Sequence, residues 1–496
     1  MGATLGSYEI ARSGLNVNER SLFVTGHNLS NANVKGYTRQ HAVIETYRYT
    51  NENYKYQIGL GASIQETRQI RHMFMDNIYR TENTKLGYWD VRNKTLTDVQ
   101  AILGDPMGEG LQKVMNEFWN SWQELCKDPS NLTYRAMVRQ RGEAFVNRVN
   151  HIGQQLSKLQ MDLNKQFSDG IDEVNKLTEQ IAKLNMDIAS NEITGDNAND
   201  LRDQRNLLVD QLSKLVDIDV TEMQDKQLYI TVGGYAVVYK GTSRNLYAGS
   251  STDEPLFFVP KVEGADAEVI LRSGSLKGIM SVRGNEFEVH GVTGGHSTPF
   301  TPTENISISH VKEMLNDLVH NIADQVNKEH MTGYTLGSSP VNNIRFFDGQ
   351  LVSPGVYDYS IGYIKINPQL EDLHYIAAGK LPGASGDNEV ALNIADLRNT
   401  PCLNNIVGML SPDEFYRATI MSLGNNGSEA LTMSGNQQNL VQAADANRQA
   451  IAGVSMDEEM SNMMKFQYAY GAATKVLNTI DEMIETVVNR MGLVGR

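Results

Sequence analysis

Residues 26–40 read GHNLSNANVKGYTRQ, a short polar stretch that follows a regular apolar pattern. Before and into this stretch, apolar or aromatic side chains recur every seven residues, which predicts a narrow stripe along a helix that packs against another helix. Three asparagines and a Gly-Tyr pair follow. Asparagine can bond the free backbone groups at a helix end, and glycine tolerates a positive φ angle. We therefore expect an N-terminal helix to end here, with a stripe formed by Tyr8, Leu15, Leu22 and Leu29.

The other end of the chain carries a second stripe. Its apolar positions alternate at spacings of three and four, polar residues flank them, and no proline interrupts them. This pattern predicts a long amphipathic helix. Because both ends carry helices whose stripes need a partner, we expect the terminal helices to pair and the two stripes to form the seam along which subunits pack. The second stripe comprises Met463, Phe466, Tyr470, Ala473, Leu477, Ile480, Ile484, Val487 and Met491.

The middle of the chain predicts a helical hairpin. Heptad spacing starts at Val149, slips by four residues at Phe167, resumes, and stops near Thr194-Gly195. A four-residue insertion unwinds a coiled coil locally without ending it. Asn199-Asp200 can cap a second helix that continues to Leu215. A further helix is predicted from about Ser309.

Two segments between these helices have the character of strands. Apolar and polar residues alternate over 228–232 and Gly233-Gly234 follows, which predicts a hairpin. The fold class expected is mainly α with β-rich insertions, elongated and multi-domain, with the terminal helices paired in a coiled-coil-like inner domain. The expected domains are a terminal helical domain (1–45 and 454–496), a helical rod (46–217, 281–332 and 399–453), and β-rich insertions at 218–280 and 333–398.

Composition and motifs limit the possible functions. The 496 residues carry a net charge of −15, which argues against nucleic acid or an anionic membrane as a partner. Two cysteines are too few for a disulfide framework, and the chain starts without a secretory signal. No metal, nucleotide or nucleophile motif occurs. We expect no catalytic, cofactor-binding or metal residues and no cofactor, and solvated or capping roles for His310, His320 and His330.

Four separated stretches, in order, resemble the flagellar axial proteins, the family of rod, hook and hook-associated subunits. They are the asparagine stretch with Gly36-Tyr37; residues 118–135, which contain Phe118-Trp119 and Asp128-Pro129; residues 195–205; and residues 453–473. The continuation Thr38-Arg39-Gln40 is similar to the hook-associated branch, the hook–filament junction proteins. The residues that carry this family signature include Asn28, Asn31, Asn33, Gly36, Tyr37, Arg39, Gln40, Asn199, Asp200 and Leu201.

The resemblance implies a structural subunit of the bacterial flagellum rather than an enzyme. Copies of the chain would form a ring between hook and filament, touching the hook protein and a second junction protein, hook-associated protein 3. A cytoplasmic export chaperone would bind the C-terminal helix. The family leaves the cell through the flagellar type III export channel without a cleaved signal, so an extracellular location is expected.

Three alternatives remain open at this point. The chain could be another axial subunit of the hook, distal rod or filament, although Arg39-Gln40 and Asn199-Asp200-Leu201 speak against this. It could be a secreted coiled-coil effector or adhesin, which would leave the paired stripes unexplained. It could also carry an enzyme in its β-rich segments, which the absence of motifs does not exclude.

Overall fold

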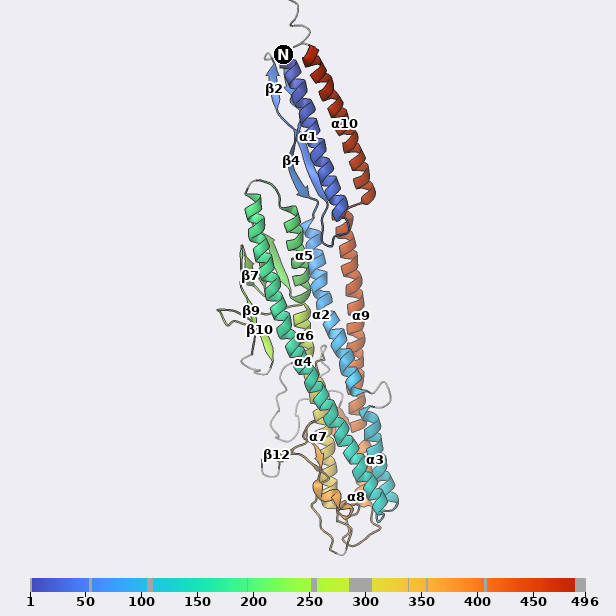
Figure 1. Ribbon diagram of the computed structural model, residues 1–496. Helices are drawn as coiled ribbons and strands as arrows, with labels where there is room; N and C mark the ends of the chain where they lie inside the picture. The colour runs from blue at the N-terminus through green and yellow to red at the C-terminus, as the bar shows by residue number, and fades with distance from the viewer. Residues whose placement is uncertain are drawn as a thin grey trace, which may run out of the picture.

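The computed structural model describes residues 2–52, 56–104, 110–193, 195–250, 257–284, 306–337, 339–353, 356–405 and 408–486. These residues form an elongated, mainly α molecule with small antiparallel sheets (Figure 1), so the predicted fold class is confirmed. The first and last described helices lie side by side at one end. Long helices form the body, and a small α/β region closes the other end.

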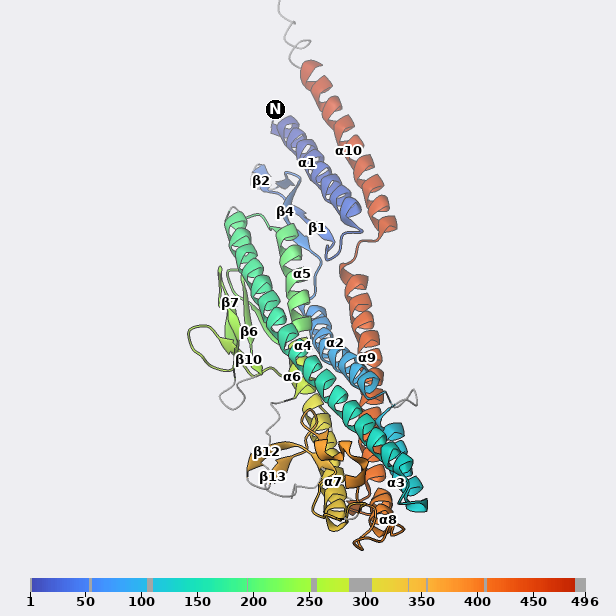
Figure 2. The same ribbon diagram turned by 60° about the horizontal axis from the view of Figure 1, so that its bottom comes forward.

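The terminal helices form an antiparallel pair, seen in both views (Figures 1 and 2). They are α1 (Gly2–Asn31) and α10 (Met456–Glu485). Small side chains allow the helices to approach closely, since a Cβ atom placed on Gly14 would lie 3.9 Å from the Ala473 Cβ atom. Among the described residues of α1, those buried are Ala11, Val17, Ser21, Val24, Thr25 and Asn28.

The two predicted stripes occupy different positions in this pair. On α10, Ile480 is only 6% exposed, whereas Tyr470 and Ile484 are about one-third exposed. The α1 stripe does not coincide with the most buried face of its helix, because Tyr8 is 37% exposed. Val487 and Met491 lie outside the described residues. The remaining stripe residues are half-buried: Leu15, Leu22, Leu29, Met463, Phe466, Ala473 and Leu477.

Strands follow α1 where the sequence predicted the end of the terminal helical domain (to residue 45) and the start of the helical rod (from residue 46). Two antiparallel strand pairs, β1–β4 and β2–β3, follow. The β1–β4 pair lies against α1, and the Ala62 amide donates to the Ser13 hydroxyl of that helix (3.2 Å). These short strands are rich in polar residues and show little alternation, so packing on α1 decides their structure more than propensity does. Their bounds are β1 Gln40–Thr46, β2 Tyr49–Glu52, β3 Tyr56–Gly59 and β4 Ala62–Gln69.

The body is built on two long helix pairs. Helix α2 (Met73–Leu103) packs along α9 (Pro412–Ala452), and α4 (Leu132–Glu192) forms the predicted hairpin with α5 (Asn199–Leu215). At 1.5 Å per residue, α4 alone extends about 90 Å. Helix α9 begins with a capping box between Ser411 and Glu414, which satisfies backbone groups at its start. Asp210 of α5 accepts from Arg80 of α2 (2.9 Å) and from Arg448 of α9, which joins three body helices.

The first β insertion is attached to α4 by asparagine side chains. Asn175 bonds both backbone groups of Leu246, and Asn185 bonds both backbone groups of Leu228. The insertion contains a four-stranded sheet in the order β5-β6-β7-β8 and a separate β9–β10 pair. Bounds are β5 Ile218–Glu222, β6 Leu228–Val232, β7 Tyr235–Tyr239, β8 Thr242–Ser243, β9 Leu246–Ser250 and β10 Phe258–Val262.

Helices also occur inside both segments predicted to be β-rich. Helix α6 (Ser275–Arg283) ends the first segment and packs on α2 and α4, and α8 (Glu389–Asp396) lies in the second. Both are shorter than the periodic runs from which a helix can be recognised. Three 3₁₀ turns and short strand pairs complete this region: Pro368–Glu371, Leu373–Tyr375, Leu397–Asn399, β11 Phe347–Asp348, β12 Gln350–Ser353, β13 Val356–Asp358, β14 Lys365–Ile366, β15 Leu403–Asn405 and β16 Gly408–Leu410.

An aromatic core holds the far end together. Phe118 and Trp122 of α3 (Leu111–Lys127) contact Phe346, and the predicted helix α7 (Ile308–Thr332) supplies His330. The expectation of a solvated or capping His330 is wrong, because its side chain is fully buried. The Ala377 amide donates to Nε2, so the ring proton lies on Nδ1 and is donated to the Ile344 carbonyl.

Both cysteines, Cys126 and Cys402, are free and partly buried. Among the residues that the structure describes, no helix combines the length and apolar character needed to cross a bilayer.

Candidate functional site

Three of the four resemblance stretches meet at one polar cluster between the terminal helices and the body. The end of α1 and the segment after it contact the start of α5 and the first turn of α10. We call this the junction cluster. Its members are Asn28, Tyr37, Thr38, Arg39, Gln40, Asn199, Asp200, Asp203, Glu458 and Glu459.

Asn28 lies at the centre of the junction cluster and is 1% exposed. Its Nδ2 donates to the Gln40 carbonyl (2.9 Å) and to Glu459 Oε2 (3.1 Å). Its Oδ1 accepts from the Gln40 amide (2.9 Å) and the Tyr37 hydroxyl (2.8 Å). The amide thus uses both donors and both acceptor positions, which is what a buried asparagine needs.

Arg39 joins the segment after α1 to α10. Its Nε donates to Glu459 Oε1 (2.8 Å), and its terminal nitrogens donate to the two carboxylate oxygens of Glu458 (2.8 and 3.1 Å). The Arg39 amide also donates to the carbonyl of Ala452, the last residue of α9 (2.9 Å). The two acidic residues lie in the first turn of α10, where the helix dipole favours negative charge.

Helix α5 forms the body side of the junction cluster. The Thr38 amide donates to Asp203 Oδ2 (2.8 Å), and Gln40 Nε2 donates to Asp200 Oδ1 (2.8 Å). Asn199 Nδ2 donates to Gln40 Oε1 (3.3 Å) and to the Thr67 carbonyl of β4 (2.9 Å). The sequence suggested that Asn199 caps α5, but it is the first helical residue and its side chain bonds other elements instead.

Burial and neighbouring acids shift two ionisable groups here. Burial raises the pKa of Asp203 to about 6, although the Thr38 amide and the Arg71 guanidinium favour its charged form. Burial, followed by the charges of Asp200, Asp203 and Glu459, also raises the pKa of the Tyr37 hydroxyl. Tyr37 therefore stays protonated and serves as the donor to Asn28.

The remaining signature residues contribute less. Asn31 Nδ2 bonds the His27 carbonyl within its own helix (3.0 Å), Asn33 is exposed, and Leu201 is half-buried. Gly36 adopts a φ of 86°, as expected, and a Cβ there would lie 3.3 Å from Leu207 Cβ. Of the three asparagines, Asn28 therefore forms the site, and Asn31 alone bonds a carbonyl of the helix end.

Four members of the cluster, Thr38, Asp203, Glu458 and Glu459, were not among the predicted site residues. All four stand inside stretches that carry the resemblance. The available signal was charge, because an arginine just after a helix end needs a carboxylate if it is buried. Sequence does not show which of 59 acidic residues provides it.

The fourth stretch is structural and lies far from the cluster. Its Arg135 is 2% exposed, and Nε and NH2 both donate to the Pro129 carbonyl (2.9 and 2.8 Å), which fixes the turn before α4. Phe118 and Trp122 are buried in the aromatic core. Among the described residues, no group of three histidine, cysteine or acidic side chains is arranged to hold a metal ion. The side chains of the junction cluster hold three distant chain segments in position.

The chain is similar in sequence to known flagellar proteins. Residues 96–347 match the family described as the flagellar hook-associated protein FlgK helical domain, and residues 448–491 match the flagellar basal body rod FlgEFG protein C-terminal family. The flagellar hook-associated protein 1 of Bacillus subtilis is 31% identical over 100% of both chains. That of Escherichia coli is 24% identical over 97% of this chain and 98% of its own.

The fold has a solved counterpart. The structure of the flagellar hook junction protein FlgK from Burkholderia pseudomallei matches with a TM-score of 0.60 at 14% identity, covering 77% of this chain and 100% of that one. This likeness shows the fold alone, whereas the full-length match to the Bacillus subtilis protein shows the family. The chain therefore belongs to the flagellar hook-associated protein 1 family.

Proposed function

We propose that this chain is a structural subunit that forms the junction between hook and filament of the bacterial flagellum. The observation that carries the proposal is that both chain ends form one helical pair, which family-signature residues attach to the body. The relatives bear the name of a flagellar hook-associated protein, and the solved structure is titled a hook junction protein. The buried Asn28 amide, whose donors and acceptor positions are all used, holds chain segments in place and offers no reactive group, which supports a structural rather than an enzymatic role.

Two surfaces of the terminal pair suit contacts with further copies in a ring. Leu15, Leu22 and Leu29 lie at the edge of the α1–α10 contact and remain half-buried. On α10, a second row of large side chains stays outside the pair; it comprises Met456, Met460, Met464 and Tyr468, which are 47–79% exposed. Covering such rows with a neighbouring copy removes apolar area from water. The terminal domain of residues 1–45 and 454–496 would then line the inside of the ring, with the insertions outward.

The other partners proposed are the hook protein on one side and hook-associated protein 3 on the other. Before export, a cytoplasmic chaperone would cover the C-terminal helix and its exposed methionines. The mature location would be extracellular, at the hook–filament junction, after export through the flagellar type III channel without a cleaved signal. Family membership supports flagellar partners and an extracellular, flagellar location, since the relatives are flagellar hook-associated proteins.

The proposal is tested by adding the purified chain to isolated hooks and examining hook ends by electron microscopy. Density at one end of each hook, absent when residues 456–496 are deleted, is expected. If the full-length folded chain leaves hook ends bare, the junction function is wrong.

A further inference from the structure

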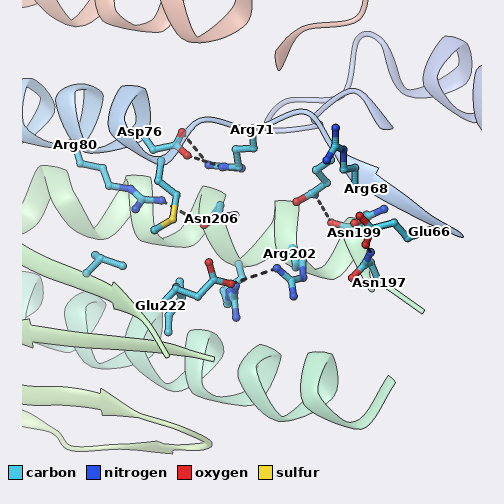
Figure 3. Close-up of a pocket in the computed structure, with 15 residues that line it drawn as sticks. Glu66, Arg68, Arg71, Asp76, Arg80, Asn197, Asn199, Arg202, Asn206 and Glu222 are labelled. Atoms are coloured by element: carbon cyan, nitrogen blue, oxygen red, sulfur yellow. Dashed lines mark hydrogen bonds and ion pairs between the residues drawn. The ribbon is translucent and has the colours of Figure 1, made fainter. Parts of the chain in front are cut away.

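A cavity of about 260 Å³ lies beside the junction cluster, between β4, the start of α2, helix α5 and the edge of the β5–β6 sheet. Figure 3 shows that its lining side chains come from these separate elements. Five arginines and three carboxylates line it. This excess of positive charge is unusual in a chain whose net charge is −15.

The three carboxylates already have partners. Asp76 Oδ2 accepts from Arg71 Nε (2.6 Å), and Glu222 Oε1 accepts from Arg202 NH1 (3.3 Å). Glu66 Oε2 accepts from Asn197 Nδ2 (3.1 Å). A third lining arginine, Arg80, pairs with Asp210 of α5 (2.9 Å). These pairs neutralise Arg71, Arg80 and Arg202. Glu66 bonds a neutral amide and keeps its charge, so two arginines and one carboxylate remain.

Those two are Arg205 and Arg68. Arg205 is 2% exposed, and its NH1 donates to two neutral oxygens, Asn185 Oδ1 (2.9 Å) and the Lys226 carbonyl (3.1 Å). Its Nε is buried and, within the part of the chain that the structure describes, has no hydrogen-bond partner. Arg68 reaches the cavity from β4, and no described carboxylate forms an ion pair with it or with Arg205.

A buried guanidinium without a counter-ion is costly, and its charge persists at neutral pH. Burial, and then the charge of Arg202, lowers the pKa of Arg205 to about 10, although the more distant Glu222 and Glu192 carboxylates favour its charged form; this value is still well above neutrality. Guanidinium groups bind phosphate and carboxylate oxygens through paired, directional hydrogen bonds. A cavity of this volume also exceeds the roughly 30 Å³ that one water occupies in the liquid.

We propose that this cavity binds a small multivalent oxyanion of the phosphate class, contacted by Arg68 and Arg205. The bound anion would bridge β4 to α5, the two elements that Asn199 also joins through the Thr67 carbonyl. By holding β4 against α5, the anion would stabilise the part of the junction cluster that α5 contributes.

The test is isothermal titration calorimetry of the full chain with inorganic phosphate and with pyrophosphate, at an ionic strength held constant with chloride. One saturable site is expected. Arg68→Gln should weaken the affinity by about tenfold, the value of one charge-assisted interaction. Arg68→Lys, which keeps the charge but loses the paired geometry, should fall between this variant and the parent chain.

The matched control is Arg417→Gln on α9, whose side chain is 68% exposed and distant from the cavity lining. It should bind as the parent does. The absence of saturable heat with the parent chain would overturn the proposal. So would equal affinities for the parent and Arg68→Gln, because the heat would then come from unspecific charge screening.

Discussion

The Arg39 guanidinium and the Glu459 carboxylate, 420 positions apart in the chain, are joined by a hydrogen bond of 2.8 Å. Glu459 is 2% exposed, so the pair is largely removed from water. Breaking a buried ion pair by removing one partner costs about 3–5 kcal/mol, because the remaining charge stays buried. This contact therefore connects the two chain ends more firmly than a surface ion pair would.

Arg39→Ala should release the terminal pair from the body. Glu459 loses its cation, and Glu458 loses both of its bonds from Arg39. We expect proteinase K, a protease of broad specificity, to cut within residues 32–40 and 452–456 much faster than in the parent, because local opening exposes these links. Arg12→Ala, at an exposed pair with Glu9, is the control. An unchanged cleavage pattern in Arg39→Ala would show that the Arg39–Glu459 ion pair does not hold the terminal helices on the body.

Asp203 predicts a pH dependence at the same place. Its pKa of about 6 lies above the ordinary value of 3.8, so the folded state binds the proton more tightly than the unfolded state does. Its contribution is therefore most favourable below about pH 4 and is lost as pH rises through 6, by up to about 3 kcal/mol. Hydrogen exchange of the peptide that contains the Thr38 amide, corrected for intrinsic rates, should show weaker protection at pH 7 than at pH 5.

Asp203→Asn should flatten that change, since the amide oxygen still accepts from Thr38 but no longer titrates. Asp169→Asn, at an exposed position on α4, is the charge-matched control and should behave as the parent does. A parent-like pH dependence in Asp203→Asn would assign the titration to another group.

At the far end of the molecule, around His330, we expect stability to depend on pH in the opposite direction. Burial lowers its pKa to about 4 from an ordinary 6.5. Its stabilising contribution is present above pH 6.5 and is lost as pH falls toward 4, on the order of 3 kcal/mol. Protonating Nε2 would also set two donors, the ring nitrogen and the Ala377 amide, against each other. Exchange of a peptide spanning Ala377 should accelerate at pH 4.5, and protection that is independent of pH would contradict this account.

Asn185→Ala should loosen the first β insertion from α4. The Asn185 side chain bonds Leu228 twice, the Lys240 carbonyl and Arg205. Leaving buried backbone groups without partners costs about 1–3 kcal/mol each. We expect faster hydrogen exchange in β6 and β7 with α4 itself unchanged. Gln166→Ala, an exposed position on the same helix, should have no effect, and equal protection in both variants would mean that sheet packing alone holds the insertion.

Periodic patterns predicted the long elements well. The stripe through Leu477 and Ile480, the heptads before Ile188 and the face of α7 each extend over many turns, so the apolar period is unambiguous. Short elements were missed for the opposite reason. Strands β1 and β4 alternate poorly, and α6 and α8 complete only two or three turns, so their structure depends on what they pack against.

The sequence predicted most residues of the junction cluster but not which of them contact one another. The resemblance selected Asn28, Tyr37, Arg39 and Gln40, yet nothing local indicates that Asn28 meets Glu459 across 431 positions. The apolar stripe of α1 does not by itself identify the face that meets α10. The close approach at Gly14 requires small residues on the contact face, and this places Leu15 and Leu22 at its edge.

That edge position allows pairing within one copy to be separated from assembly between copies. Ile480→Asp places a carboxylate at the most buried stripe position of α10, so it should open the α1–α10 pair and increase cleavage of both helices by protease. Thr479→Asp, at the exposed neighbouring position, should leave the pair closed.

Leu22→Asp adds the same charge at the half-buried edge of α1, where the carboxylate can still reach water. We expect it to keep a parent-like protease pattern yet fail to bind hook ends and to restore swimming in a strain that lacks the parent gene. If Leu22→Asp binds hooks and swims normally, copies do not meet along this edge, and the exposed methionine row of α10 becomes the surface to test.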